Sequence, residues 1–193
     1  MRKETIAISV GRPEHKPDAS LNPDVQFTST FRAGGQLGYG RYGNQTWLAV
    51  EEAIGQLEGG KTLIFSSGMA AINAVFNILP IGGVVTASNQ GYSGTMTVLK
   101  MLNESGRLEV RFVDVANTKE VLDAIPGTQL LWLESPTNPC LDVAELPTLI
   151  KAAKSAGIGV AVDNTFATPM NQNPLEMGAD IVMNSVTKFL AGR

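Results

Sequence analysis

Apolar residues gather in six short runs from residue 62 onward, and each run is nearly continuous rather than alternating with polar positions. Such runs are typical of strands in a sheet whose two faces are both covered. The six predicted strands are TLIF (62–65), VVTAS (84–88), VRFVDV (110–115), LLWLES (130–135), GVAVDN (159–164) and DIVMNS (180–185).

Segments with apolar positions on one helical face precede or separate these strands. Thr46 is predicted to cap the first helix, and Gly59-Gly60 to end it. Asn117 and Glu120 have the spacing of a capping box. The five predicted helices span residues 47–58, 69–79, 93–103, 117–125 and 146–157. Strands that alternate with helices indicate an α/β fold with a mostly parallel sheet and helices on both faces.

Residues 1 to about 45 have a different composition, rich in Gly, Pro, Asn and Ser, with only short apolar pieces. A segment of this kind cannot bury a core of its own. We therefore expect an N-terminal arm at 1–45, either disordered or lying on another surface, followed by a domain at 46–193.

Composition and charge narrow the function class. The formal net charge of −3 gives no basic surface for nucleic acid or an anionic membrane, and no apolar run reaches the length of about 18 residues that spans a membrane. Cys140 is the single cysteine, which fits a reducing cytoplasm. The lone His15 is expected in a solvated loop. We expect a cytoplasmic protein that acts on a small molecule, with no nucleic-acid, membrane or metal partner.

Polar residues follow four of the predicted strands at the point where each strand ends. They are found at 66–68, 134–138, 163–165 and 185–188. Because ligands of open α/β sheets bind beyond the carboxyl ends of the strands, the sequence predicts a binding site at this edge.

Two groups at this edge are candidates for a phosphate site. The backbone N–H groups of Gly68 and Met69 would open a helix, and a helix N-terminus favours phosphate. The segment matches neither the Walker pattern nor G-x-G-x-x-G, and glycine turns of this type are also common without a ligand. Ser185 and Thr187 place two hydroxyls on the same side of the predicted strand, although such pairs are more often structural.

Asp163, Lys188 and Tyr92 are the candidates for chemistry. A carboxylate that ends an apolar strand must pair or become neutral, so Asp163 is a cap, a salt-bridge partner or a partner for a protonated heterocyclic nitrogen. Lys188 shares the same edge, and a lysine becomes a nucleophile when burial or a nearby cation lowers its pKa. Tyr92 either packs in the core or stacks on a planar cofactor.

Together these segments resemble the Cys/Met-metabolism enzymes that depend on pyridoxal 5′-phosphate (PLP), a family that includes cystathionine γ-synthase, cystathionine γ-lyase, cystathionine β-lyase and methionine γ-lyase. The resemblance covers essentially the whole chain. It rests on YGRYGNQT (39–46), LEGGKTLIFSSGMAAI (57–72), LLWLESPTNP (130–139), VDNTFATP (162–169) and ADIVMNSVTKFLAG (179–192). The sequence departs from the family pattern at Gln45, at NQGYSGT (89–95) and at Arg193.

The resemblance implies a fold-type-I, aspartate-aminotransferase-like domain with PLP as cofactor, and it implies roles for the matching residues. Lys188 would carry PLP as a Schiff base and move protons. Asp163 would pair with the pyridine nitrogen, with Thr165 nearby, and Asn138 would bond the phenolic oxygen. Tyr92 would stack on the ring and act as an acid or base.

The phosphate of PLP would be held by Gly68, Met69, Ser185 and Thr187. Tyr39 and Arg41, in the arm, would reach the phosphate in a neighbouring subunit, which implies a homo-oligomer built as a dimer of dimers. Family members are longer than this chain. We therefore expect the chain to be truncated after Lys188, without the C-terminal domain whose arginine holds the substrate carboxylate.

The function implied is PLP-dependent transsulfuration, with γ-elimination or γ-replacement on cystathionine or an activated homoserine. The alternatives are a truncated, non-catalytic relative that binds PLP, or a carbon–sulfur lyase of the methionine γ-lyase or cystathionine β-lyase type. ESPTNP (134–139) and VDNTF (162–166) argue against an aminotransferase, and the absent glycine fingerprint argues against a nicotinamide-dependent oxidoreductase.

Overall fold

The computed structural model describes residues 1–192. Contacts within the chain divide it into two compact units, Met1–Ile64 and the residues from Phe65 onward. The division into an arm at 1–45 and a PLP-binding domain at 46–193 remains a proposal about the folded enzyme.

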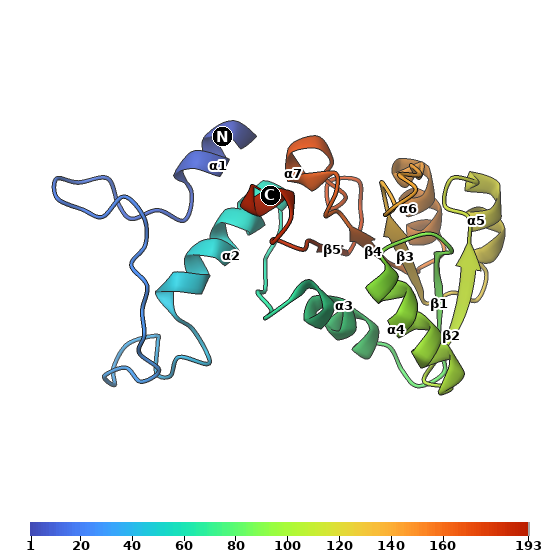
Figure 1. Cartoon of the computed structure of the whole chain (residues 1–193), viewed down its shortest axis with the longest axis horizontal. Coiled ribbons are helices and arrows are strands. Elements are labelled where there is room, and N and C mark those ends of the chain that lie inside the picture. Colours follow the sequence, from blue (N-terminus) through green and yellow to red (C-terminus); the bar gives the residue numbers. More distant parts are fainter. Residues whose placement is uncertain (193) are drawn as a thin grey trace. The chain divides into compact units, whose positions relative to one another are not determined.

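The first unit contains two helices, α1 (Lys3–Ser9) and α2 (Gln45–Glu58), joined by a long irregular segment (Figure 1). The prediction that Thr46 caps α2 is wrong. Asn44 is the N-cap, and its side chain accepts the Thr46 N–H at 2.9 Å. The Thr46 hydroxyl instead accepts the N–H of Gln26 at 2.8 Å. Gly59 ends the helix as predicted, with a left-handed φ of 81°.

The second unit is built on a parallel sheet of five strands in the order β2-β1-β3-β4-β5. Its strands are β1 (Gly83–Ser88), β2 (Leu108–Val113), β3 (Leu130–Glu134), β4 (Gly159–Asp163) and β5 (Ile181–Met183). This arrangement confirms the α/β fold with a parallel sheet.

Three strand predictions need correction. The strand predicted at 110–115 lies two residues earlier, as β2 (Leu108–Val113). The TLIF segment at 62–65 is not a strand, because no neighbouring strand within residues 1–192 shares its backbone hydrogen bonds, and Leu63 is 76% exposed. The predicted strand at 180–185 is shorter than expected, and β5 ends at Met183. Its last polar residues turn away from the sheet, and the Ser185 N–H donates to the Thr165 hydroxyl at 2.9 Å.

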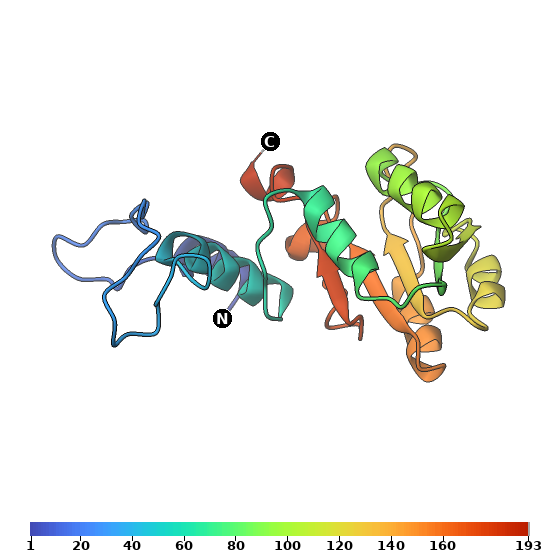
Figure 2. The same ribbon diagram turned by 90° about the horizontal axis from the view of Figure 1, so that it is seen from below.

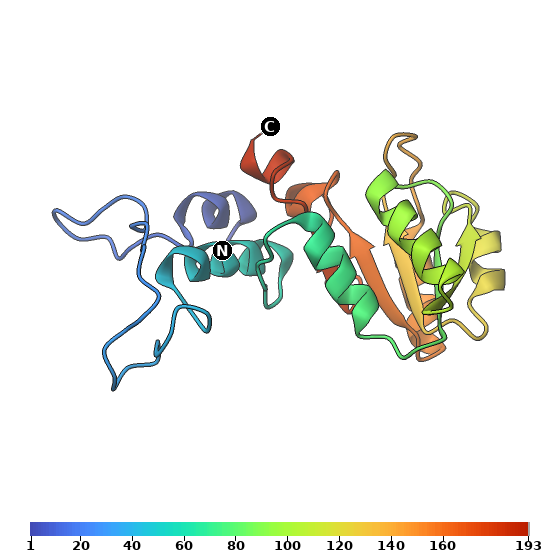
Figure 3. The same cartoon turned by 60° about the horizontal axis from the view of Figure 1, so that its bottom comes forward.

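The helices of the second unit cover both faces of the sheet. They are α3 (Gly68–Asn77), α4 (Ser93–Glu104), α5 (Thr118–Ala124), α6 (Leu146–Ser155), α7 (Thr168–Asn171) and the 3₁₀-helix η1 (Phe189–Ala191). Figures 2 and 3 show α3 and α4 together on one face, with α5 and α6 on the other.

The continuous apolar pattern of β3 follows from the presence of helices on both faces of the sheet. Leu130 and Trp132 are buried in the cluster under α3 and α4, whereas Leu131 and Leu133 are buried in the cluster under α5 and α6. Successive side chains of a strand point to opposite faces, so a strand covered on both sides needs an apolar residue at nearly every position.

The capping box predicted for α5 is only half formed. The Asn117 side chain accepts the Glu120 N–H at 3.3 Å, as expected. The Glu120 carboxylate, however, accepts the N–H of Asp114 at 3.0 Å rather than that of Asn117, because the Asn117 N–H already donates to the Asp114 carbonyl.

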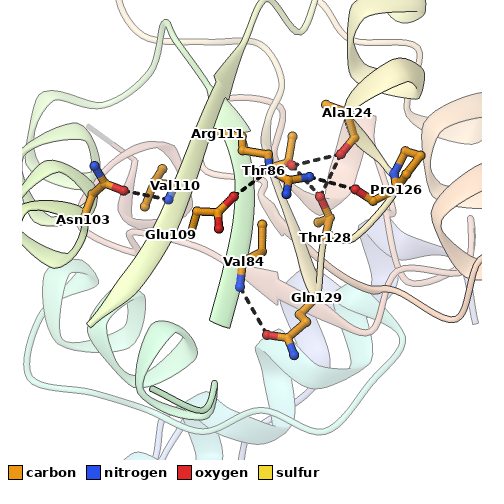
Figure 4. A network of polar contacts seen from close by, with 10 residues as sticks. All are labelled: Val84, Thr86, Asn103, Glu109, Val110, Arg111, Ala124, Pro126, Thr128 and Gln129. Atoms are coloured by element: carbon orange, nitrogen blue, oxygen red, sulfur yellow. Dashed lines mark hydrogen bonds and ion pairs between the residues drawn. The ribbon is translucent and has the colours of Figure 1, made fainter. Parts of the chain in front are cut away.

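A polar network at the start of the sheet ties the loop before β3 to β1 and β2 (Figure 4). The hydroxyl of Thr86, fully buried in β1, lies 2.6 Å from that of Thr128. Arg111 on β2 donates to the Pro126 carbonyl at 2.7 Å, and the Gln129 side chain accepts the Val84 N–H at 3.2 Å. These bonds fix the sheet at the end opposite the predicted site.

Among residues 1–192, no helix has the length and apolar character needed to cross a membrane.

Candidate cofactor site

A cavity of about 260 Å³ lies at the carboxyl ends of the strands in the second unit. It contains nine of the eleven residues predicted to bind or act on a cofactor: Gly68, Met69, Tyr92, Asn138, Asp163, Thr165, Ser185, Thr187 and Lys188. Residues up to 120 positions apart in sequence thus share one hollow, as expected where parallel strands deliver their ends to one edge.

One wall of the cavity has the features of a phosphate cradle. Helix α3 begins at Gly68, and the Ser67 hydroxyl caps it by accepting the Ala70 N–H at 3.1 Å. The first N–H groups of a helix have no partner within the helix, so those of Gly68 and Met69 are available to an anion. A Cβ on Gly68 would lie 3.2 Å from the Ser185 side chain, which explains a glycine at this close approach.

The Ser185 and Thr187 hydroxyls lie 3.4 Å apart beside this helix start. The prediction that they lie on a strand is wrong, because β5 ends at Met183. After β5 the chain turns, and the Lys188 N–H donates to the Ser185 carbonyl at 3.0 Å. The turn still presents both hydroxyls to the cavity.

Asp163 is the last residue of β4 and is only 4% exposed. One carboxylate oxygen accepts the Thr165 N–H at 3.0 Å. Burial raises the pKa of Asp163, and hydrogen bonds from Thr165 offset part of that rise. Within residues 1–192 no ion pair involves Asp163. A buried carboxylate without a cationic partner, open to a cavity, suits a protonated ring nitrogen.

Lys188 lies directly before η1, exposed and facing the same cavity. It forms no ion pair among the described residues. Its position therefore leaves the ammonium group available to a ligand in the cavity.

Tyr92 and Asn138 come from the loops that follow β1 and β3. Tyr92 is 39% exposed, and Gly94 makes room for its ring, because a Cβ there would lie 2.5 Å from that ring and 2.7 Å from the Met69 sulfur. Asn138 lies in the segment between β3 and α6. Both residues line the cavity beside Asp163.

Glu134, the last residue of β3, also lines the cavity. The sequence places it at the predicted edge, within the polar residues 134–138, but it was given no role toward a ligand. It is 6% exposed, and its two oxygens accept the N–H groups of Tyr92 and Asn138. Burial, together with the charge of Asp163, raises the pKa of Glu134 to about 7, while the bonds from Tyr92 and Asn138 act in the opposite direction. The signal that could have identified it is the one used for Asp163, a carboxylate that ends an apolar strand.

Tyr39 and Arg41 belong to the first unit. The Arg41 guanidinium lies 5.2 Å from the centre of the Tyr39 ring, a cation–π contact. Their role toward a phosphate stays a prediction.

The cavity fits the groups of PLP. It combines a helix start and two hydroxyls for a phosphate, a buried carboxylate for a pyridine nitrogen, an aromatic ring for stacking, and a lysine that forms no ion pair in the described part of the chain.

Comparisons with known proteins point to the same chemistry. The family model described as "Cys/Met metabolism PLP-dependent enzyme" matches residues 4–193. A cystathionine gamma-lyase of Bacillus subtilis is 40% identical over 100% of the chain and 52% of its own length. Cystathionine beta-lyase MetC of the same organism is also 40% identical, over 90% of the chain and 46% of its own length.

A solved structure of cystathionine gamma synthase from Xanthomonas oryzae pv. oryzae, in complex with aminoacrylate and cysteine, superposes with a TM-score of 0.93 and 32% sequence identity. The match covers 100% of the chain and 52% of that structure. The chain thus spans about half the length of the relatives that it matches.

Proposed function

Because the chain belongs to the family of Cys/Met metabolism PLP-dependent enzymes, we propose that it supplies the cofactor-binding part of a transsulfuration enzyme. The reaction is γ-elimination of cystathionine, which breaks its carbon–sulfur bond, or γ-replacement on an activated homoserine, in which the activated oxygen leaves as an incoming thiol forms a carbon–sulfur bond. The names of its relatives, which include gamma-lyases and gamma-synthases, support this choice.

The single observation that carries the proposal is the meeting of Lys188, Asp163 and the start of α3 in one cavity. A lysine, a buried carboxylate and a phosphate cradle are the three groups that PLP needs. The alternative of a non-catalytic PLP-binding relative is not favoured by the comparisons.

The predicted site residues that line the cavity each have a role in this proposal. Asp163 holds the proton of the ring nitrogen, and Thr165 orients the carboxylate through its N–H. Asn138 binds the phenolic oxygen, and Tyr92 covers the ring and exchanges protons with the reacting groups. When bound, PLP supplies an electron-withdrawing ring that stabilises negative charge on the substrate.

Lys188 anchors the cofactor and then moves protons at the α- and β-carbons of the substrate. The phosphate is held by Gly68, Met69, Ser185 and Thr187. Tyr39 and Arg41 complete that site from a neighbouring subunit of a homo-oligomer, a dimer of dimers. The free Cys140 supports a location in the reducing cytoplasm.

Titration of the chain with PLP tests the proposal. A visible absorption band that saturates and that changes when cystathionine is added is the expected result. Lys188→Ala should abolish the band, whereas Lys151→Ala, on the exposed side of α6, should leave it intact. An equal band in the Lys188→Ala variant would contradict the assignment.

A further inference from the structure

The two carboxylate oxygens of Glu134 are both used by backbone groups. Oε2 accepts the Tyr92 N–H at 2.8 Å, and Oε1 accepts the Asn138 N–H at 2.9 Å. Neither amide has a second acceptor in the described part of the chain. Each oxygen of one buried group therefore holds a different loop.

These loops are distant in sequence and carry two residues of the cavity. Tyr92 lies between β1 and α4, 42 residues before Glu134, whereas Asn138 lies four residues after it. Because β1 and β3 are neighbours in the sheet, the end of β3 can reach both loops at once.

The backbone at Gly91 passes so close to the Glu134 carboxylate that a side chain there would contact it. A Cβ at position 91 would lie 2.9 Å from Glu134 Oε2, closer than ordinary van der Waals contact. A larger residue there would push the carboxylate away from the Tyr92 N–H.

The chemistry of the contact requires a carboxylate rather than an amide. A carboxylate presents acceptors on both oxygens, whereas the side chain of glutamine has one acceptor and one NH₂ donor. In a Glu134→Gln variant, one of the two backbone N–H groups would face the NH₂ group of the glutamine, which is itself a donor. Burial and the nearby charge of Asp163 raise the pKa of Glu134 to about 7, whereas the two backbone hydrogen bonds favour the charged carboxylate and limit that rise.

We propose that Glu134 is a positioning residue of the cofactor site, whose carboxylate fixes Tyr92 and Asn138 relative to each other. The role of the two positioned residues toward PLP rests on the proposed function. The contact of the Glu134 carboxylate with the Tyr92 and Asn138 amides, called the clamp below, rests only on the geometry of this chain.

Hydrogen exchange in the cofactor-free chain tests the clamp directly. The Tyr92 and Asn138 amides should be protected in the wild type, and at least one should exchange about tenfold faster in Glu134→Gln. The matched control is Glu120→Gln, which removes a carboxylate that also accepts a backbone N–H but does not line the cavity. It should leave both amides unchanged.

PLP titration of the same variants gives the second measurement. Glu134→Gln should raise the dissociation constant of PLP about tenfold, the size of effect expected from one lost hydrogen bond to a charged group. At saturating PLP, the visible ellipticity per bound cofactor should fall, because Tyr92 and Asn138 no longer hold the ring in one orientation. A general loss of stability would lower occupancy but would not change this value per bound PLP.

Gly91→Ala provides a second variant that keeps the carboxylate and displaces it. It should shift exchange, affinity and ellipticity in the same direction, whereas Gly35→Ala, with open space around its Cβ, should not. If Glu134→Gln fails to fold, exchange in the wild type and the Gly91→Ala results decide the question.

The proposal is overturned if the two wild-type amides exchange like free loop amides, or if both variants match the wild type in exchange and in ellipticity per bound PLP. A wild type that binds no PLP would instead contradict the proposed function, and the exchange pattern would still decide whether Glu134 holds the two loops.

Discussion

Glu134 and Asp163 lie directly opposite each other in the register of β3 and β4, and each is the last residue of its strand. Residues paired across parallel strands point to the same face, so both carboxylates enter the cavity from the same side of the sheet. Both are almost fully buried, and burial raises both pKa values. The cavity therefore contains a pair of buried carboxyl groups, those of Glu134 and Asp163, which favour a positively charged ligand.

This pair predicts an unusual dependence of stability on pH. The folded pKa of Glu134 is about 7, against an ordinary 4.5, so the folded state binds the proton more tightly than the unfolded state. Its contribution to stability is present below pH 4.5 and is lost as the pH rises through 7, by about 3 kcal/mol in all.

Urea unfolding of the cofactor-free chain between pH 4.5 and 8 measures this effect. The free energy of unfolding of the wild type should fall, relative to that of Glu134→Gln, as the pH rises. Curves that stay parallel over this range would show that Glu134 titrates normally in the folded state.

Asp163→Asn should separate stability from cofactor binding. Because Asp163 is buried and has no cationic partner among residues 1–192, a neutral amide should leave the cofactor-free chain at least as stable at pH 8. The amide cannot balance a pyridinium charge, so PLP affinity should fall by about a hundredfold. Unfolding curves and PLP titration check the two parts, with Asp123→Asn on the exposed face of α5 as control. Unchanged affinity would exclude Asp163 as the partner of the ring nitrogen.

The paired hydroxyls of Ser185 and Thr187 should act on the phosphate and not on the ring. The double variant Ser185→Ala/Thr187→Ala should weaken PLP binding about tenfold, through the loss of hydrogen bonds to a charged group. Binding of pyridoxal, which lacks the phosphate, should change little. The measurement is the ratio of the dissociation constants of PLP and pyridoxal in the wild type and in the double variant. An equal loss of affinity for both ligands would show that the phosphate does not bind at these hydroxyls.

The sequence was sufficient for most of the sheet because both of its faces are buried. Strands such as β3 and β4 are apolar at nearly every position, and their ends are marked by the polar residues that follow. The segment at 62–65 has the same apolar pattern but no neighbouring strand in the described chain, and pattern alone does not reveal whether a partner exists.

The site was predictable only where a local motif marked it. Asp163, Lys188 and Glu134 all stand in segments that resemble a known family. The bond from Tyr92 that gives Glu134 its role comes from a loop 42 residues earlier, so the local motif did not reveal it. Likewise, Asn44 displaces Thr46 as the cap of α2 because Thr46 bonds a residue 20 positions away. Long-range hydrogen bonds of this kind leave no local pattern.

We propose that PLP attaches to the protein at Lys188. The most direct test is borohydride reduction of the chain with PLP, followed by mass mapping of the peptides. One pyridoxyl group is expected, on the peptide that contains Lys188, and none on peptides with other lysines such as Lys151. Labelling scattered over many lysines, or none at Lys188, would contradict it.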